Sequence, residues 1–136
     1  MASVPKRTFT VAEYLELESK SEEKHEYYNG EIFAMSGARK EHIRISGNMY
    51  YALRAKLEGK PCEPFNSDMA VRVSRSYYTF PAVTVGCNPE FEAGAIDVLL
   101  NPRVIVEVLS PSTESHDRHF KLSRYQQMAS VTEILF

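Results

Sequence analysis

The stretch RVIVEVLS, residues 103–110, decides how this chain of 136 residues is interpreted. Its apolar and mostly β-branched residues are typical of a strand that is covered on both faces. Glu107 is the only charge inside the apolar run, and the alternation of strand side chains puts it on the same face as Ile105 and Leu109. A buried carboxylate must be paired, protonated or bound to a cation. Glu107 is therefore the first candidate functional residue, with a structural bridge to an Arg or Lys as the alternative.

The composition indicates a single globular domain over residues 1–136. Hydrophobic residues make up 43% and charged residues 25% of the chain, which is ordinary for a soluble protein. The 16 basic and 18 acidic residues give a net charge of -2, so a basic coat for nucleic acid is excluded and an anionic ligand would have to meet a local patch.

The two cysteines and the first ten residues are used to predict the cellular compartment of the protein. Cys62 and Cys87 fit neither a metal-ligand spacing nor a dense disulfide framework, and Cys87, at a strand end, is expected to behave as a small hydrophobe. The start MASVPKRTFT has no apolar core of a signal peptide, and no apolar run approaches the length of a membrane span. We expect a cytoplasmic protein with no secretion signal and no membrane contact.

Local signals predict a helix, a hairpin and a second helix in the first half of the chain. The run from Thr10 to Glu13 matches a capping box, so a helix is expected over residues 11–18. Asn29-Gly30 is a strong hairpin signal between strands at 25–28 and 31–35. A longer helix is expected over 39–59. Its core-facing stripe would be Ile45, Met49 and Leu53, extended by His42.

The second half of the chain indicates strands, a helix and a final strand. Pro81 should force a bulge, an edge or a strand end within the second strand. The core order is then α-β-β-β-α-β, after the first helix and the hairpin, which predicts a mixed sheet with helices on its faces in an α/β or α+β domain. The expected elements are strands over 62–73, 77–87 and 103–110, a loop over 87–102, a helix over 117–130 and a strand over 131–136.

The first turns of the helix after residue 116 carry polar residues that this order brings towards Glu107. Asp117 and Lys121 are four residues apart and so share a helical face, with Arg118 and His119 between them. The alternative is a capping Asp and an exposed helical ion pair of little energetic weight.

Five segments resemble the Uma family of restriction-endonuclease-like proteins, a bacterial group within the PD-(D/E)XK nuclease superfamily. They are HEYYNGEIFAMSG, EHIRISGNMYYALRAKL, SDMAVRV, VIVEVLSPST and DRHFKLSRY. The resemblance covers nearly the whole chain, and VIVEVLSPST followed by an Asp and a helical Lys is its most specific part. It implies the same core order and metal-dependent hydrolysis of phosphodiester bonds in DNA. In that superfamily an Asp and a Glu on adjacent strands bind Mg²⁺, and a Lys positions or activates the attacking water.

By this resemblance, the Glu of the motif is Glu107 and the Lys, which the family supplies from the next helix, is Lys121. The Asp falls on Ala82 in the segment Pro81-Ala82-Val83, and Ala82 has no oxygen to offer. Mg²⁺ or Mn²⁺ would be weakly bound, and cleavage weak or absent, unless Asp68 reaches the site. The alternative for Asp68 is an ordinary turn residue.

Further residues match positions that the family keeps or could contact DNA. His42 is either a site residue or a partly buried core histidine, and Glu26 is either a site residue or one half of a cross-strand pair. A phosphate-binding rim is expected around Arg39 and Arg118, with scattered surface charge as the alternative. The full set for this rim is Arg39, Lys40, Arg44, Arg118, His119 and Arg124.

The last predicted strand stops at Phe136 without a closing turn, whereas the family continues. We therefore expect a domain that is truncated at its C-terminal end, with an exposed edge that a homodimer or a partner would cover. Three hypotheses follow: an impaired Mg²⁺-dependent DNA hydrolase, an inactive module that binds nucleic acid or protein, and a scaffold in which Glu107 and Lys121 form only a buried bridge.

Overall fold

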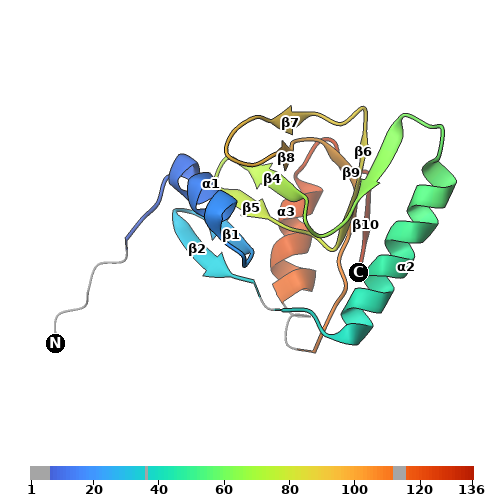
Figure 1. Cartoon of the computed structure of the whole chain (residues 1–136), viewed down its shortest axis with the longest axis horizontal. Helices are drawn as coiled ribbons and strands as arrows, with labels where there is room; N and C mark the ends of the chain where they lie inside the picture. Colours follow the sequence, from blue (N-terminus) through green and yellow to red (C-terminus); the bar gives the residue numbers. More distant parts are fainter. Residues whose placement is uncertain (1–6, 36, 112–115) are drawn as a thin grey trace.

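The computed structural model describes residues 7–35, 37–111 and 116–136 as two β-sheets with helices around them (Figure 1). One sheet has six strands in the order β2-β1-β5-β4-β8-β7, and the other has four in the order β10-β9-β6-β3. The elements are α1 Val11–Lys20, β1 His25–Tyr28, β2 Glu31–Ala34, α2 Lys40–Leu57, β3 Cys62–Phe65, β4 Ala70–Ser74, β5 Tyr77–Thr79, β6 Val83–Cys87, β7 Phe91–Glu92, β8 Val98–Leu99, β9 Pro102–Val106, a π-helical segment His116–Lys121 that continues into α3 Leu122–Gln126, and β10 Glu133–Leu135.

The first helix and the hairpin form as their local signals predict. The Thr10 side chain accepts from the Glu13 N–H while the Glu13 carboxylate accepts from the Thr10 N–H, which completes the capping box. Asn29 and Gly30 have φ values of 47° and 85°, and this pair of left-handed residues forms the tight turn between β1 and β2. Both predictions are confirmed.

The two long strands predicted over 62–73 and 77–87 are each broken in two, so that part of the prediction is wrong. A turn at residues 66–69, in which the Asn66 side chain accepts from the Asp68 N–H at 2.9 Å, separates β3 from β4. Residues 80–82, which contain Pro81, separate β5 from β6. Because β3 and β6 belong to the four-stranded sheet and β4 and β5 to the other, the chain crosses between the sheets twice within residues 62–87. Ala82 consequently lies at the junction of the two sheets.

The last third of the chain keeps the predicted order with smaller elements. β9 is antiparallel to β6 and parallel to β10, so the sheet is mixed as expected. Residues 87–102, expected as a loop, contain the short strands β7 and β8. The expected helix ends at Gln126 rather than at residue 130. The mixed α+β architecture that the sequence predicts is thus confirmed.

Cys62 and Cys87 form a disulfide, which corrects the expectation of a free, hydrophobe-like thiol at Cys87. The two residues face each other directly in the antiparallel register of β3 and β6. Neither cysteine could be paired by spacing alone, because the pairing depends on the register between two strands.

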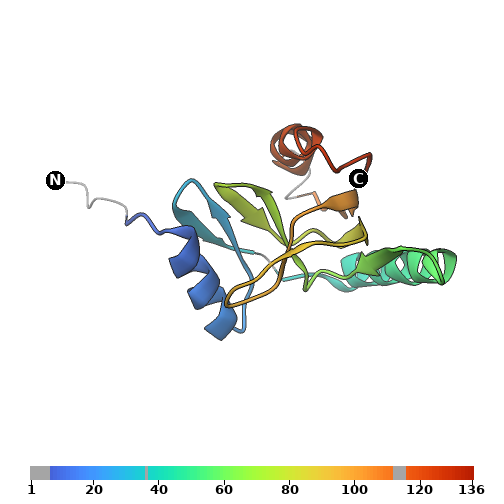
Figure 2. The ribbon, with the colours of Figure 1, turned by 90° about the horizontal axis from the view of Figure 1, so that it is seen from above.

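The second helix is less buried than its pattern predicts. Figure 2 shows α2 beyond the edge of the four-stranded sheet, where its main contacts are with β3 and β6. Ile45, expected in the core, is 52% exposed, whereas His42, Met49 and Leu53 are half-buried. An edge strand offers the helix one narrow line of contact, so the stripe predicted at Ile45 is wrong.

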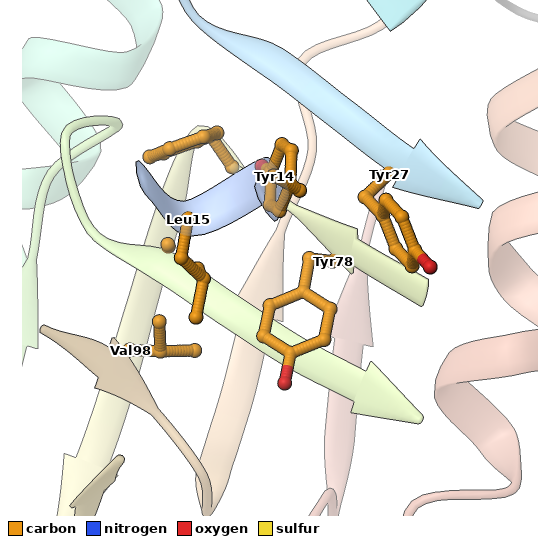
Figure 3. Close-up of a cluster of buried hydrophobic side chains, with 7 residues drawn as sticks. Tyr14, Leu15, Tyr27, Tyr78 and Val98 are labelled. Atoms are coloured by element: carbon orange, nitrogen blue, oxygen red, sulfur yellow. The ribbon is translucent and has the colours of Figure 1, made fainter. Parts of the chain in front are cut away.

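Two hydrophobic clusters lie on opposite faces of the six-stranded sheet. Figure 2 shows α1 on one side of this sheet and α3 on the other. On one face, α1 covers Tyr27, Tyr78 and Val98 with Tyr14 and Leu15 (Figure 3). On the other face, the π-helical segment and α3 cover the second cluster. Because strand side chains alternate, the neighbours of Tyr27 and Tyr78 point to this second face. The second cluster is formed by Val71, Val73, Tyr77, Leu99, Ile105 and Tyr125.

Among the described residues, no helix has the length and apolar character that crossing a membrane requires.

Candidate active site

Glu107 follows β9 directly and lies between the four-stranded sheet and the helix of residues 116–126, only 6% exposed. Its backbone N–H still pairs with Leu135 of β10 at 2.9 Å. One carboxylate oxygen accepts from the backbone N–H of Ala82 at 3.1 Å. The other accepts from the Lys121 Nζ and the Tyr125 hydroxyl, each at 3.0 Å. The buried acid is therefore oriented by three donors from two segments, the connection between β5 and β6 and the helix of residues 116–126.

Lys121 joins this carboxylate to a second one. Its Nζ lies 3.0 Å from Glu107 Oε2 and 3.2 Å from Glu26 Oε1, and the residue is only 6% exposed. Lys121 and Tyr125 are four residues apart, and both point from one helical face towards Glu107. A buried ammonium is stable here because two carboxylates compensate its charge.

Glu26 reaches the site from the hairpin through strand register. β1 and β5 pair antiparallel with Tyr27 opposite Tyr78, so one step further along the ladder Glu26 faces Thr79. The Thr79 hydroxyl donates to Glu26 Oε1 at 2.6 Å. Glu26 therefore pairs across strands with Thr79 and also contacts Lys121.

Two buried tyrosines border the same carboxylates. Burial, followed by the charge of Glu107, raises the pKa of Tyr125 well above its ordinary value. Burial also raises the pKa of Tyr77. The Lys121 ammonium acts to lower this pKa, whereas the carboxylates of Glu26 and Glu107 raise it. Both phenols therefore remain protonated donors. The Tyr125 hydroxyl donates a hydrogen bond to Glu107, whereas the buried Tyr77 hydroxyl has no hydrogen-bond partner among the described residues.

Of the residues singled out in the sequence, Ala82, Glu107 and Lys121 come together with Glu26, whereas Asp68 and His42 do not join them. Ala82, Glu107 and Lys121 meet around one carboxylate, as described above. Asp68 lies in the turn before β4, where its 80% exposed side chain pairs with Lys24 at 3.1 Å. His42 lies half-buried on α2. Within the described ranges, no hydrogen bond or ion pair connects Asp68 or His42 with Glu107.

The expected basic rim is divided between two helices. Arg39 precedes α2 and is exposed, and Arg118 is exposed on the π-helical segment. Arg124 is engaged instead in the fold, since its guanidinium stacks 4.3 Å from the Phe120 ring centre and donates to the Tyr28 hydroxyl. The Asp117 side chain lies outside the described residues.

Three site groups, Tyr77, Thr79 and Tyr125, were not anticipated as such from the sequence. Tyr125 had a signal, since it follows Lys121 by four residues on the same helix. Tyr77 and Thr79 had none, because their approach to Glu26 depends on pairing between distant strands. Among the described residues, no group of three or more His, Cys, Asp and Glu is arranged to hold a metal ion.

Comparison with known proteins supplies the remaining observation. Residues 11–136 match the model of the family Uma2, described as "Putative restriction endonuclease". Two uncharacterized proteins of Synechocystis sp. are similar: slr1290 is 40% identical over 98% of this chain and 70% of its own, and sll1609 is 31% identical over 95% and 74%. A crystal structure described as a "putative nuclease belonging to DUF820", from Anabaena variabilis, covers 92% of this chain and 74% of its own with a TM-score of 0.72 and 18% identity. That structure has the same fold.

Proposed function

The chain belongs to the Uma2 family of restriction-endonuclease-like proteins, and from this premise we propose that it is a Mg²⁺- or Mn²⁺-dependent DNA hydrolase whose rate is lowered by Ala82. The observation that carries the proposal is the contact of 3.1 Å between the Ala82 N–H and Glu107 Oε1. The backbone of residue 82 therefore lies beside the Glu107 carboxylate, and an acid at this position would add a second carboxylate to the same region.

The carboxylate oxygens of Glu107 and Glu26 are the type of ligand that a hard divalent cation prefers. Carboxylate oxygens and water are the ligands that Mg²⁺ prefers, and Glu26 and Glu107 both lie within contact of one ammonium. When bound, such a cation polarises a phosphoryl group and generates hydroxide from water at neutral pH. With Ala82 in place of an acid, the site has one carboxylate fewer than the family pattern, so we expect weak cation binding.

The remaining residues have roles that follow from their chemistry. Tyr125 and the Ala82 N–H hold the Glu107 carboxylate in one orientation. The Lys121 ammonium stands next to this carboxylate, where it would stabilise charge that develops on a phosphate. Arg39 and Arg118, both exposed, would contact the DNA backbone without reading its sequence.

The test is cleavage of plasmid DNA with Mg²⁺ or Mn²⁺ by the wild type and by Ala82→Asp. We expect the Asp variant to cleave at least tenfold faster, because it returns a carboxylate beside Glu107. Ala82→Asn is the matched control, since it adds the same volume without the charge, and adding Glu107→Gln to Ala82→Asp should abolish the gain. Equal and negligible cleavage by all variants would refute the hydrolase.

A second candidate is a binding module that keeps the fold without the chemistry. The observation in its favour is that three protein donors already occupy the Glu107 oxygens. This candidate predicts that DNA binding, measured by fluorescence anisotropy, persists in EDTA and weakens in Arg39→Ala and Arg118→Ala. Absence of both DNA binding and cleavage would leave the purely structural bridge between Glu107 and Lys121.

A further inference from the structure

Among the described residues, the charges around Lys121 do not balance. Two carboxylates, those of Glu26 and Glu107, share the Lys121 ammonium, and their side chains are 17% and 6% exposed. A buried negative charge without compensation is costly, so such a group is normally paired with a cation or protonated. One further positive charge would therefore neutralise these two carboxylates together with Lys121.

The Tyr77 hydroxyl provides a separate sign of a missing ligand. Tyr77 is 1% exposed, and its hydroxyl is a buried donor without a partner among the described residues. It lies on β5 two residues before Thr79, so both side chains point to the face that Glu26 occupies. A buried hydroxyl of this kind normally bonds to protein or to an ordered water.

We propose that Glu26 is the second carboxylate of the cation site, beside Glu107, and that the Tyr77 hydroxyl donates to a water held by that cation. This inference rests on the proposed hydrolase function and names the group that replaces the acid absent at position 82. Mg²⁺ suits such a site because it keeps several of its waters and needs only one or two carboxylates.

The positions of Glu26 and Glu107 suit a shared cation without a large rearrangement of the site. Glu26 Oε1 and Glu107 Oε2 both contact the same Nζ, so the two carboxylates are already close neighbours. The Thr79 hydroxyl and the β1–β5 ladder hold Glu26, while the Ala82 N–H and Tyr125 hold Glu107. Lys121 has a flexible stem of four carbons, which would allow its ammonium to stay with one carboxylate if both carboxylates held a cation.

Mn²⁺ binding, followed through the loss of the free-ion EPR signal, tests the proposal without depending on cleavage. The variants are Glu26→Gln, Glu107→Gln and the control Glu63→Gln, which removes an exposed carboxylate from β3. Glu26→Gln keeps an acceptor for Thr79, so the fold should be retained, and circular dichroism checks this. We expect Glu26→Gln and Glu107→Gln each to raise the Kd for Mn²⁺ at least tenfold, with no change in Glu63→Gln.

Two further variants protect the test against a folding defect. Glu26→Asp keeps the charge and should bind better than Glu26→Gln, and Tyr77→Phe should weaken binding a few-fold by removing only the hydroxyl. Adding Ala82→Asp to Glu26→Gln should restore binding to about the wild-type level, because one carboxylate replaces another.

The outcomes separate this inference from the function on which it rests. Wild-type binding in Glu26→Gln together with lost binding in Glu107→Gln would overturn the role of Glu26 and leave the hydrolase standing. If neither the wild type nor Ala82→Asp binds Mn²⁺, both proposals fall.

Discussion

Replacing Lys121 by Met should destabilise the protein more than any surface charge change. Met has a similar length and no charge, so the variant strands the carboxylates of Glu26 and Glu107, which contact the ammonium at 3.2 and 3.0 Å. Removing one partner of a buried ion pair costs about 3–5 kcal/mol, because it leaves an uncompensated charge. For 136 residues, an unfolding entropy of about 2.1 cal/mol/K per residue converts this loss into a fall in Tm of roughly 10–17 °C.

The assay is urea denaturation at pH 7 with a parallel thermal melt. The matched control is Lys20→Met, because Lys20 forms an exposed ion pair with Glu16 on α1, and its loss should leave Tm unchanged within error. The double variant Lys121→Met/Glu107→Gln should recover part of the loss, since it removes one of the two stranded charges. A fall of less than about 1 kcal/mol in the free energy of unfolding would refute a buried ammonium between two carboxylates.

Two other predictions concern pH and redox state. Burial raises the pKa of Tyr78 to about 12 and that of Tyr125 well above its ordinary value, so above pH 10 the unfolded chain loses phenol protons that the folded chain keeps. The free energy of unfolding should then fall with rising pH by about 1.4 kcal/mol per unit for each such group, and a urea series from pH 9 to 11 should show a shallower fall for Tyr125→Phe. Reduction of the disulfide between Cys62 and Cys87, 25 residues apart, should lower the free energy of unfolding by about 3.5 kcal/mol, and Cys62→Ser/Cys87→Ser should make stability independent of dithiothreitol.

Local chemistry made part of the fold predictable from the sequence. The capping box at Thr10 and the Asn29-Gly30 turn each involve atoms within a few residues, so no distant contact can overrule them easily. Glu107 was identified for a related reason, since a charge inside an apolar run has few stable solutions. The α+β order followed from these elements.

Contacts between distant segments limited the rest. Asn66-Ser67-Asp68 is typical of a turn, but the apolar pattern resumes at Met69 and Val71, so the sequence does not show that the chain changes sheets there. The stripe on α2 could not reveal that this helix lies at a sheet edge, which exposes Ile45. Likewise, the approach of Glu26 to Lys121 requires the register of β1 on β5 and the placement of a helix nearly one hundred residues later.

The arrangement around Lys121 favours a functional site over a structural bridge. A buried ion pair is often replaceable by apolar residues with no loss of stability, so stability alone gives little reason to maintain one. This site holds more than a pair, since Glu26 adds a second carboxylate, and the Tyr77 hydroxyl has no hydrogen-bond partner among the described residues. In our proposal, a hydrated cation would compensate the second carboxylate and supply the hydroxyl with a partner. A scaffold would gain from losing them, whereas a hydrolase that lacks an acid at position 82 would need them.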